Sequence, residues 1–251
     1  MRRALNYIAE RRRSFALLAF FEYLRDRSVA PGERFLFTPA VAPFVMAFAD
    51  LNKYALRVPK PTAIIEHLLN AHSEEDATHF ELYLRDLETL GFDTPGTFAG
   101  TLRFLWADER NYSRQTCYSL AALLAAAPLT LRLVIVEAIE AAGAAAFETL
   151  GELAADYEEQ TGQELHFFGQ HHKALETGHT MGSDDIEQRI DAIVLNDEEL
   201  RQAHSLIDRV FEIFAAMMDE LHRYGLHVRA SGAASPNAPR SSARSTCPDR
   251  E

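Results

Sequence analysis

Residues 133–143 read Leu-Val-Ile-Val-Glu-Ala-Ile-Glu-Ala-Ala-Gly, within an apolar run that extends from about 129 to 160. The small residues at 141–146 allow neighbouring helices to approach this segment closely. Glu137 and Glu140 stand out in it, because a carboxylate is costly to bury unless it is paired or ligates a metal. We therefore expect a central helix that presents one acidic ligand to the interior, with Glu140 preferred and Glu137 as its substitute.

Helical periodicity continues on both sides of this run. The sequence shows no sustained period-two alternation and no Asn-Gly or Asp-Gly turn between apolar runs, which are the usual signals of strands and hairpins. We expect helices over residues 2–27, 31–56, 61–90, 94–126, 129–160, a short segment ending at 179, 184–195 and 197–224. Seven or eight helices joined by short loops predict an all-α fold, a compact helical bundle.

The composition suggests one domain followed by a tail. The chain has 251 residues, 47% of them hydrophobic, so a single core of substantial size can form over residues 1–228. From position 229 the sequence changes to Ala, Ser, Pro, Gly and Arg, which leaves almost nothing to bury. We expect residues 229–251 to be a disordered C-terminal tail.

Charge and cysteine content exclude several classes of partner. A formal charge of −12 argues against a nucleic-acid-binding surface, which needs clustered Lys and Arg. The apolar runs, Leu120–Leu129 among them, look too short for a bilayer span, so we expect no membrane partner. Two cysteines, Cys117 and Cys247, make a structural disulfide improbable and favour a reducing, cytoplasmic setting. Cys117 has no base in its sequence context and is expected to be a buried thiol.

Two short segments concentrate histidine and carboxylate. The first is Ala71-His-Ser-Glu-Glu-Asp-Ala-Thr-His-Phe80, and the second is Gln170-His-His-Lys-Ala-Leu-Glu-Thr-Gly-His179. His172, Glu176 and His179 follow the spacing i, i+4, i+7, which places three side chains on a narrow stripe of one helix. His72, Asp76 and His79 repeat that spacing.

Each stripe contains an acid-x-x-His pair, the unit that helical di-iron carboxylate proteins project inward from two helices. Imidazole and carboxylate together suit a first-row transition metal. One such stripe alone is more typical of a polar surface, but two matched stripes and an isolated carboxylate on a core helix favour a metal site. Glu75 lies four residues before His79 and can replace Asp76 as the oxygen donor. Glu22 is a weaker candidate for a further oxygen ligand.

These residues resemble the haem-oxygenase-like di-iron oxidase and oxygenase superfamily, whose fold is related to that of the thiaminase-II-like proteins. The resemblance covers most of residues 14–225. It lies in the run from His172 to His179, the helix around Glu140, the opening Ser28-Val-Ala-Pro-Gly-Glu33, and the phrase Glu75-Asp-Ala-Thr-His-Phe-Glu-Leu-Tyr-Leu-Arg-Asp-Leu-Glu-Thr-Leu-Gly91.

The resemblance implies a haem-oxygenase-like bundle and a non-haem iron pair that reacts with O2 to oxidise a small organic substrate, of the amine, amino acid or fatty acid class. His172, Glu176, His179 and His79 match the family's ligands, and the middle-helix carboxylate matches Glu140 or Glu137. Some family members carry a carboxylate seven residues before the matching histidine, and that position here is His72. Asp76 or Glu75 would then supply the oxygen donor, and His72 would be a ligand or the neighbour of one. Whether the site binds one iron or two is left undecided by this departure.

Other assignments remain beside this one. Manganese accepts the same nitrogen and oxygen ligands as iron. A ferritin-like bundle fits the order of the acidic and histidine residues as well. Haem is not expected, because the first histidine in the chain is His67. A metal-free thiaminase-like or cofactorless oxidase, or a non-catalytic iron-binding scaffold, would use the same polar groups differently. A homodimer is compatible with the amphipathic helices, although no interface can be identified from the sequence.

Overall fold

A computed structural model describes residues 1–76, 78–93, 96–169, 190 and 193–232. The elements are α1 (Arg2–Phe15), α2 (Ala19–Arg25), α3 (Pro31–Arg34), the short helix η1 (Phe35–Phe37), α4 (Thr38–Asp50), the π-helical turn η2 (Leu51–Leu56), α5 (Ile64–Asp76), α6 (Phe80–Thr89), α7 (Phe98–Leu105), η3 (Asp108–Arg110), α8 (Asn111–Ala126), α9 (Leu129–Thr161) and α12 (Asp197–Ala230). The part of the chain described in these ranges contains helices and no strand, so the expected all-α class is confirmed.

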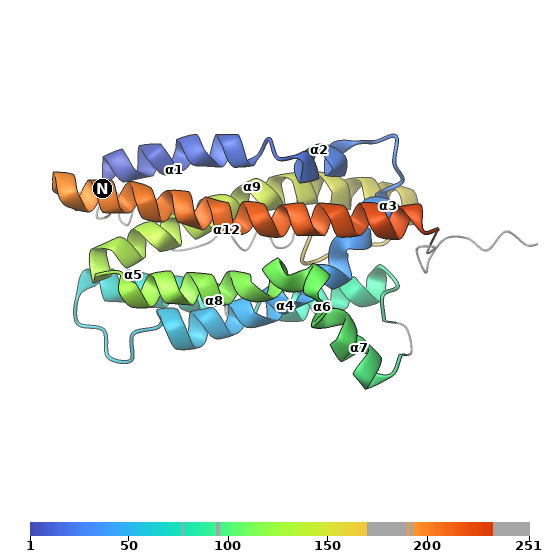
Figure 1. Cartoon of the computed structure of the whole chain (residues 1–251), viewed down its shortest axis with the longest axis horizontal. Helices are drawn as coiled ribbons and strands as arrows, with labels where there is room; N and C mark the ends of the chain where they lie inside the picture. The colour runs from blue at the N-terminus through green and yellow to red at the C-terminus, as the bar shows by residue number, and fades with distance from the viewer. Residues whose placement is uncertain (77, 94–95, 170–189, 191–192, 233–251) are drawn as a thin grey trace, which may run out of the picture.

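Two long helices form the centre of the bundle. α9 has 33 residues and α12 has 34, and the two pack against each other. Figure 1 shows α12 along the long axis of the molecule, with α1 on one side and α8 and α4 on the other. Because α9 is buried by α1, α2, α5 and α12, the apolar run at its centre lies in the core, as its sequence predicts.

Some expected helices are interrupted. The segment 2–27 is divided into α1 and α2 by extended backbone at Leu18, and 94–126 is divided into α7, η3 and α8. The segment 61–90 is divided between α5 and α6. At the other end of the chain α12 continues to Ala230, beyond the boundary expected at residue 228.

Separate tertiary contacts account for the break between α5 and α6. In α5, Ser73 Oγ donates to the carbonyl of Asn52 in η2 at 2.7 Å. In α6, the hydroxyl of Tyr83 donates to the carbonyl of Thr38 at 2.8 Å. Because α5 packs against η2 and α9 while α6 packs against α4, one straight helix could not serve both sets of contacts.

The run Pro31–Leu56 has the length and composition of a membrane span, with 26 residues that include an 18-residue window of mean hydropathy 1.4. This corrects the expectation that every apolar run is too short for one. In the bundle the run comprises α3, η1, α4 and η2, and 56% of its 18-residue window is buried inside the protein. Burial inside the protein explains the apolar composition, as in the core helices of soluble bundles.

Buried ionic groups connect helices that are distant in the sequence. Arg34 is 2% exposed, and its guanidinium donates to the carbonyl of Leu24 at 2.6 Å and to Asp156 Oδ2 on α9 at 2.9 Å. Glu220 on α12 is 3% exposed and accepts bonds from the backbone N–H groups of Tyr112 and Ser113 at 2.7 and 2.8 Å. Its carboxylate therefore caps the N-terminus of α8, where backbone donors have no partner within the helix.

Replacing the capping carboxylate should destabilise the bundle. Glu220→Gln puts an amide nitrogen where an oxygen accepts bonds, so we expect the free energy of unfolding to fall by about 1–3 kcal/mol. Urea denaturation followed by circular dichroism measures the change. Glu212→Gln, at an exposed position of the same helix, is the matched control and should change little. Equal stability of the two variants would contradict the capping role.

Candidate functional site

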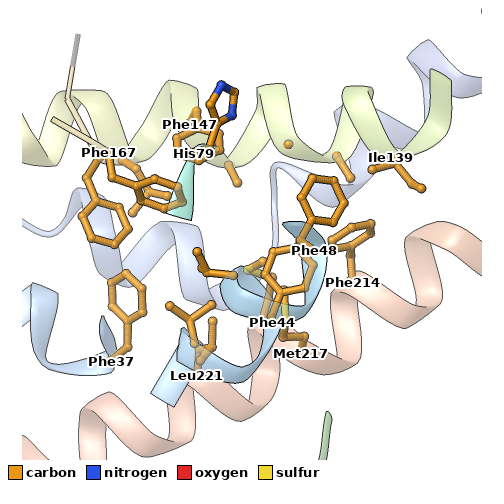
Figure 2. A pocket seen from close by; sticks show the side chains of 18 of the residues that line it. Phe37, Phe44, Phe48, His79, Ile139, Phe147, Phe167, Phe214, Met217 and Leu221 are labelled. Carbon is orange, nitrogen blue, oxygen red and sulfur yellow. The ribbon is translucent and has the colours of Figure 1, made fainter. Parts of the chain in front are cut away.

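An apolar cavity of about 120 Å³ lies inside the bundle, between α2, α4, α9 and α12 (Figure 2). Its described lining includes nine phenylalanines, together with Met217 and Met218. Several rings contact each other edge to face, such as Phe44 with Phe214 at 5.7 Å between centroids and Phe147 with Phe167 at 5.3 Å. Among the described lining residues, the charged or titratable side chains are His79 and Glu140.

Glu140 links the cavity to α5. Its Oε1 lies 3.1 Å from Nε2 of His72, so an imidazole from α5 and a carboxylate from α9 meet at the wall of the cavity. The His72 side chain is 3% exposed, whereas that of Glu140 is 34% exposed. Of the two acidic residues expected on this helix, Glu140 lines the described cavity and Glu137 does not.

The neighbours of His72 fix its position. Asn70 exchanges two hydrogen bonds with the backbone of Val58, at 2.7 and 2.9 Å, and Ser73 donates to the carbonyl of Asn52. These bonds hold α5 against the segment before it and against the π-helical turn. His72 is therefore directed at α9 by contacts on both sides of it in the sequence.

His79 reaches the cavity in a way that the sequence did not predict. α5 ends at Asp76 and α6 begins at Phe80, so His79 is the residue before α6, in the turn between the two helices. The expected stripe of His72, Asp76 and His79 on one continuous helix is therefore wrong. His79 nevertheless lines the same cavity as Glu140, and Figure 2 shows its ring at the edge of the group of phenylalanines, beside α9.

The other expected ligands are placed as follows. His172, Glu176 and His179 lie outside the described residues, and so do the side chains of Glu75 and Asp76. Glu22, the weaker candidate, is exposed on α2 and does not line the cavity, so it is not brought to the site.

The described donors fit part of a metal site. Imidazole and carboxylate are ligands that iron and manganese both accept, and His72, His79 and Glu140 supply them beside an apolar cavity. Within the ranges that the structure describes, no group of three or more His, Cys, Asp or Glu side chains is close enough to hold an ion. A complete site therefore needs donors beyond these three residues.

Asp86, which the sequence analysis did not single out, holds part of the cavity wall in place. It is fully buried on α6, and its carboxylate accepts bonds from the backbone N–H groups of His166, Phe167 and Phe168 at 2.7, 2.9 and 3.0 Å. Phe167 and Phe168 line the cavity. We call this interaction the Asp86 clamp. It fixes the chain immediately before the segment that contains His172, Glu176 and His179.

Burial dominates the electrostatics of the clamp. It raises the pKa of Asp86 above the usual range of an aspartate, while the three backbone hydrogen bonds act in the opposite direction. A signal for this role was present in the sequence, because Asp86 shares one helical face with Tyr83 and Leu90, both buried. A carboxylate on the apolar face of an amphipathic helix needs partners there.

Cys117 behaves as its sequence context predicts. It is a buried free thiol on α8, with Sγ 3.6 Å from the carbonyl oxygen of Phe44. Burial raises the pKa of the thiol to about 12. Because the thiolate is the nucleophilic form, Cys117 is a poor candidate for covalent catalysis.

Comparison with known proteins identifies the fold. No family model matches the chain, and no curated protein sequence matches it. A crystal structure of a domain of unknown function with a haem oxygenase-like fold, from Shewanella denitrificans OS217, matches with a TM-score of 0.63 and 12% sequence identity. The match covers 92% of this chain and 94% of that one. The chain therefore has a haem oxygenase-like fold, and at this identity the likeness establishes the fold alone.

Loss of the Asp86 carboxylate should weaken the clamp. Asp86→Asn leaves an amide N–H facing backbone donors, so we expect the free energy of unfolding to fall by about 1–3 kcal/mol near neutral pH. Glu88→Gln, at an exposed position of the same helix, is the matched control. Thermal and urea unfolding of both variants measure the difference.

The stability difference should also depend on pH. Because the pKa of Asp86 is raised in the folded protein, the folded state holds this proton more tightly than the unfolded chain. Its contribution to stability is then fully present below the pKa of the unfolded chain and declines as pH rises through the folded pKa. The wild type should therefore lose part of its advantage in free energy of unfolding over Asp86→Asn as pH rises from the pKa of the unfolded chain through the pKa of the folded protein. An advantage that grows with pH would contradict the assignment.

Proposed function

We propose that this haem oxygenase-like bundle is a non-haem iron oxygenase or oxidase, with two iron ions, that uses O2 to oxidise a small organic substrate. The supporting observation is the contact of His72 Nε2 with Glu140 Oε1, made between two helices at the wall of an apolar cavity that His79 also lines. A haem oxygenase-like fold and nitrogen and oxygen donors beside a cavity are the features that such an enzyme needs.

The proposed ligands come from several segments. Glu140 and His79 would hold metal at the cavity, and His72 would either bind it or orient the Glu140 carboxylate. The remaining donors in this proposal are Asp76 or Glu75 and the group His172, Glu176 and His179. Bound iron would supply the electrons for reaction with O2. Manganese is the alternative metal.

The chain's own residues would prepare the site. The phenylalanine walls exclude water, which strengthens electrostatic interactions inside the cavity and limits side reactions. His72 is almost fully buried, and its contact fixes one oxygen of Glu140. The Asp86 clamp holds Phe167 and Phe168 against the cavity and thus fixes its shape.

Metal content tests this proposal. After anaerobic loading with ferrous iron and desalting, the wild type should retain about two irons per chain, as helical di-iron proteins do. Glu140→Gln and His79→Ala should each retain less iron, because each removes a donor. Glu152→Gln on the exposed face of α9 and His67→Gln on the exposed face of α5 are matched controls and should bind as the wild type does.

Oxygen uptake by the loaded protein completes the test. Consumption of O2 that is lost in Glu140→Gln and kept in Glu152→Gln would support an oxygen-activating centre. One iron per chain would indicate that His72, in place of a carboxylate, has removed the second site. A well-folded wild type that binds no metal would refute the proposal and leave a metal-free enzyme or a scaffold.

A further inference from the structure

Gly143 occupies an unusual place in the cavity wall. It lies near the middle of α9, three residues after Glu140, and lines the cavity. Among the described residues, a Cβ atom built at this position would meet no atom within 4 Å beyond its chain neighbours and the nearby backbone of its own helix. No described side chain therefore fills the space in front of Gly143, and no described backbone requires a glycine there.

Helix stability does not explain the glycine either. Glycine in a helix interior is less favourable than alanine, and the neighbouring positions 141, 142 and 144–146 are all alanine. The residue at 143 thus leaves room beside Glu140 at a cost in helix propensity. Space that no described side chain fills, next to the one described carboxylate of the cavity, is where a bound group would sit.

The volume indicates the size of that group. A cavity of about 150 Å³ lined by apolar side chains is large enough to bind benzene. The cavity here measures about 120 Å³. It is somewhat smaller than that reference cavity, so one six-membered ring or a short branched hydrocarbon is about the largest group that it admits.

The lining indicates the chemistry of the group. The described walls contain phenylalanine rings, aliphatic side chains and two methionines, and no described lining residue is a lysine or arginine. A buried carboxylate or ammonium needs a partner, and Glu140 is already in contact with His72. Aromatic walls favour another ring, packed in edge-to-face or offset geometry.

We propose that this cavity binds an uncharged apolar group of single-ring size, seated against Gly143, and that the side chain at position 143 sets the largest group admitted. As a statement about the substrate, it rests on the proposed oxygenase function. The binding itself needs no metal, so it can be tested separately.

The experiment measures binding of ring probes to the full-length, metal-free protein by calorimetry and by the shift in melting temperature. Toluene should bind and raise the melting temperature. Benzoate and benzylamine, which carry the same ring with a charge, should bind at least about tenfold more weakly because they bring an unpaired charge into the cavity. Anthracene should not bind, since it exceeds the volume.

Variants at position 143 test the role of the glycine. Gly143→Ala should keep toluene affinity within about threefold, since one methyl group leaves most of the space open, whereas Gly143→Leu should reduce it at least about tenfold by filling the cavity. Ala155→Leu, at an exposed position of the same helix, is the control for adding a large side chain and should bind as the wild type does.

Each outcome decides one of the two proposals. Toluene that fails to bind the wild type, or that binds a folded Gly143→Leu as tightly, overturns the pocket assignment, and so does benzoate that binds as well as toluene. If Gly143→Leu does not fold, the wild-type probe series decides alone. Toluene binding without iron binding would refute the proposed oxygenase and support the pocket assignment. Iron binding without toluene binding would refute the pocket assignment and support the proposed oxygenase.

Discussion

The three backbone hydrogen bonds accepted by Asp86 determine how the cavity is built. They join α6 to residues 166–168, a segment that is distant from α6 in the sequence. The bonds lie in the core, where water cannot compete with them. Phe167 and Phe168 become a wall of the cavity because of this interaction. One buried carboxylate therefore shapes the apolar wall of the cavity.

Much of the fold could be predicted from the sequence, because long helices produce their own periodic signal. The apolar run of α9 and a helix over residues 197–224 were expected, and the all-α class inferred from helical periodicity along the chain is confirmed. The breaks at Leu18 and between α5 and α6 were not, because local sequence favours helix through both. Tyr83 and Ser73 bond to carbonyl groups that are distant in the chain, and those tertiary contacts override the local preference.

The candidate site, too, was predicted only in part from the sequence. Glu140 was predicted because an isolated carboxylate on a core helix needs a partner, and His72 is that partner in the described structure. Their direct contact could not be predicted, since helix periodicity does not say which helices face each other. Asp86 was missed although it shares a helical face with apolar residues, because its partners are backbone N–H groups that are distant in the sequence. Gly143 was missed because an absent side chain gives no motif, and its role becomes visible only when the packing around it is known.

Cys117 has a further consequence through its burial between α4 and α8. A thiol whose pKa is about 12 is almost entirely protonated at neutral pH, and its position shields it from reagents. Alkylation at this residue then requires the two helices to separate. The rate at which Cys117 is alkylated therefore measures how often the bundle opens beside Phe44, a residue of the cavity wall. The rate can be followed on the peptide that contains Cys117.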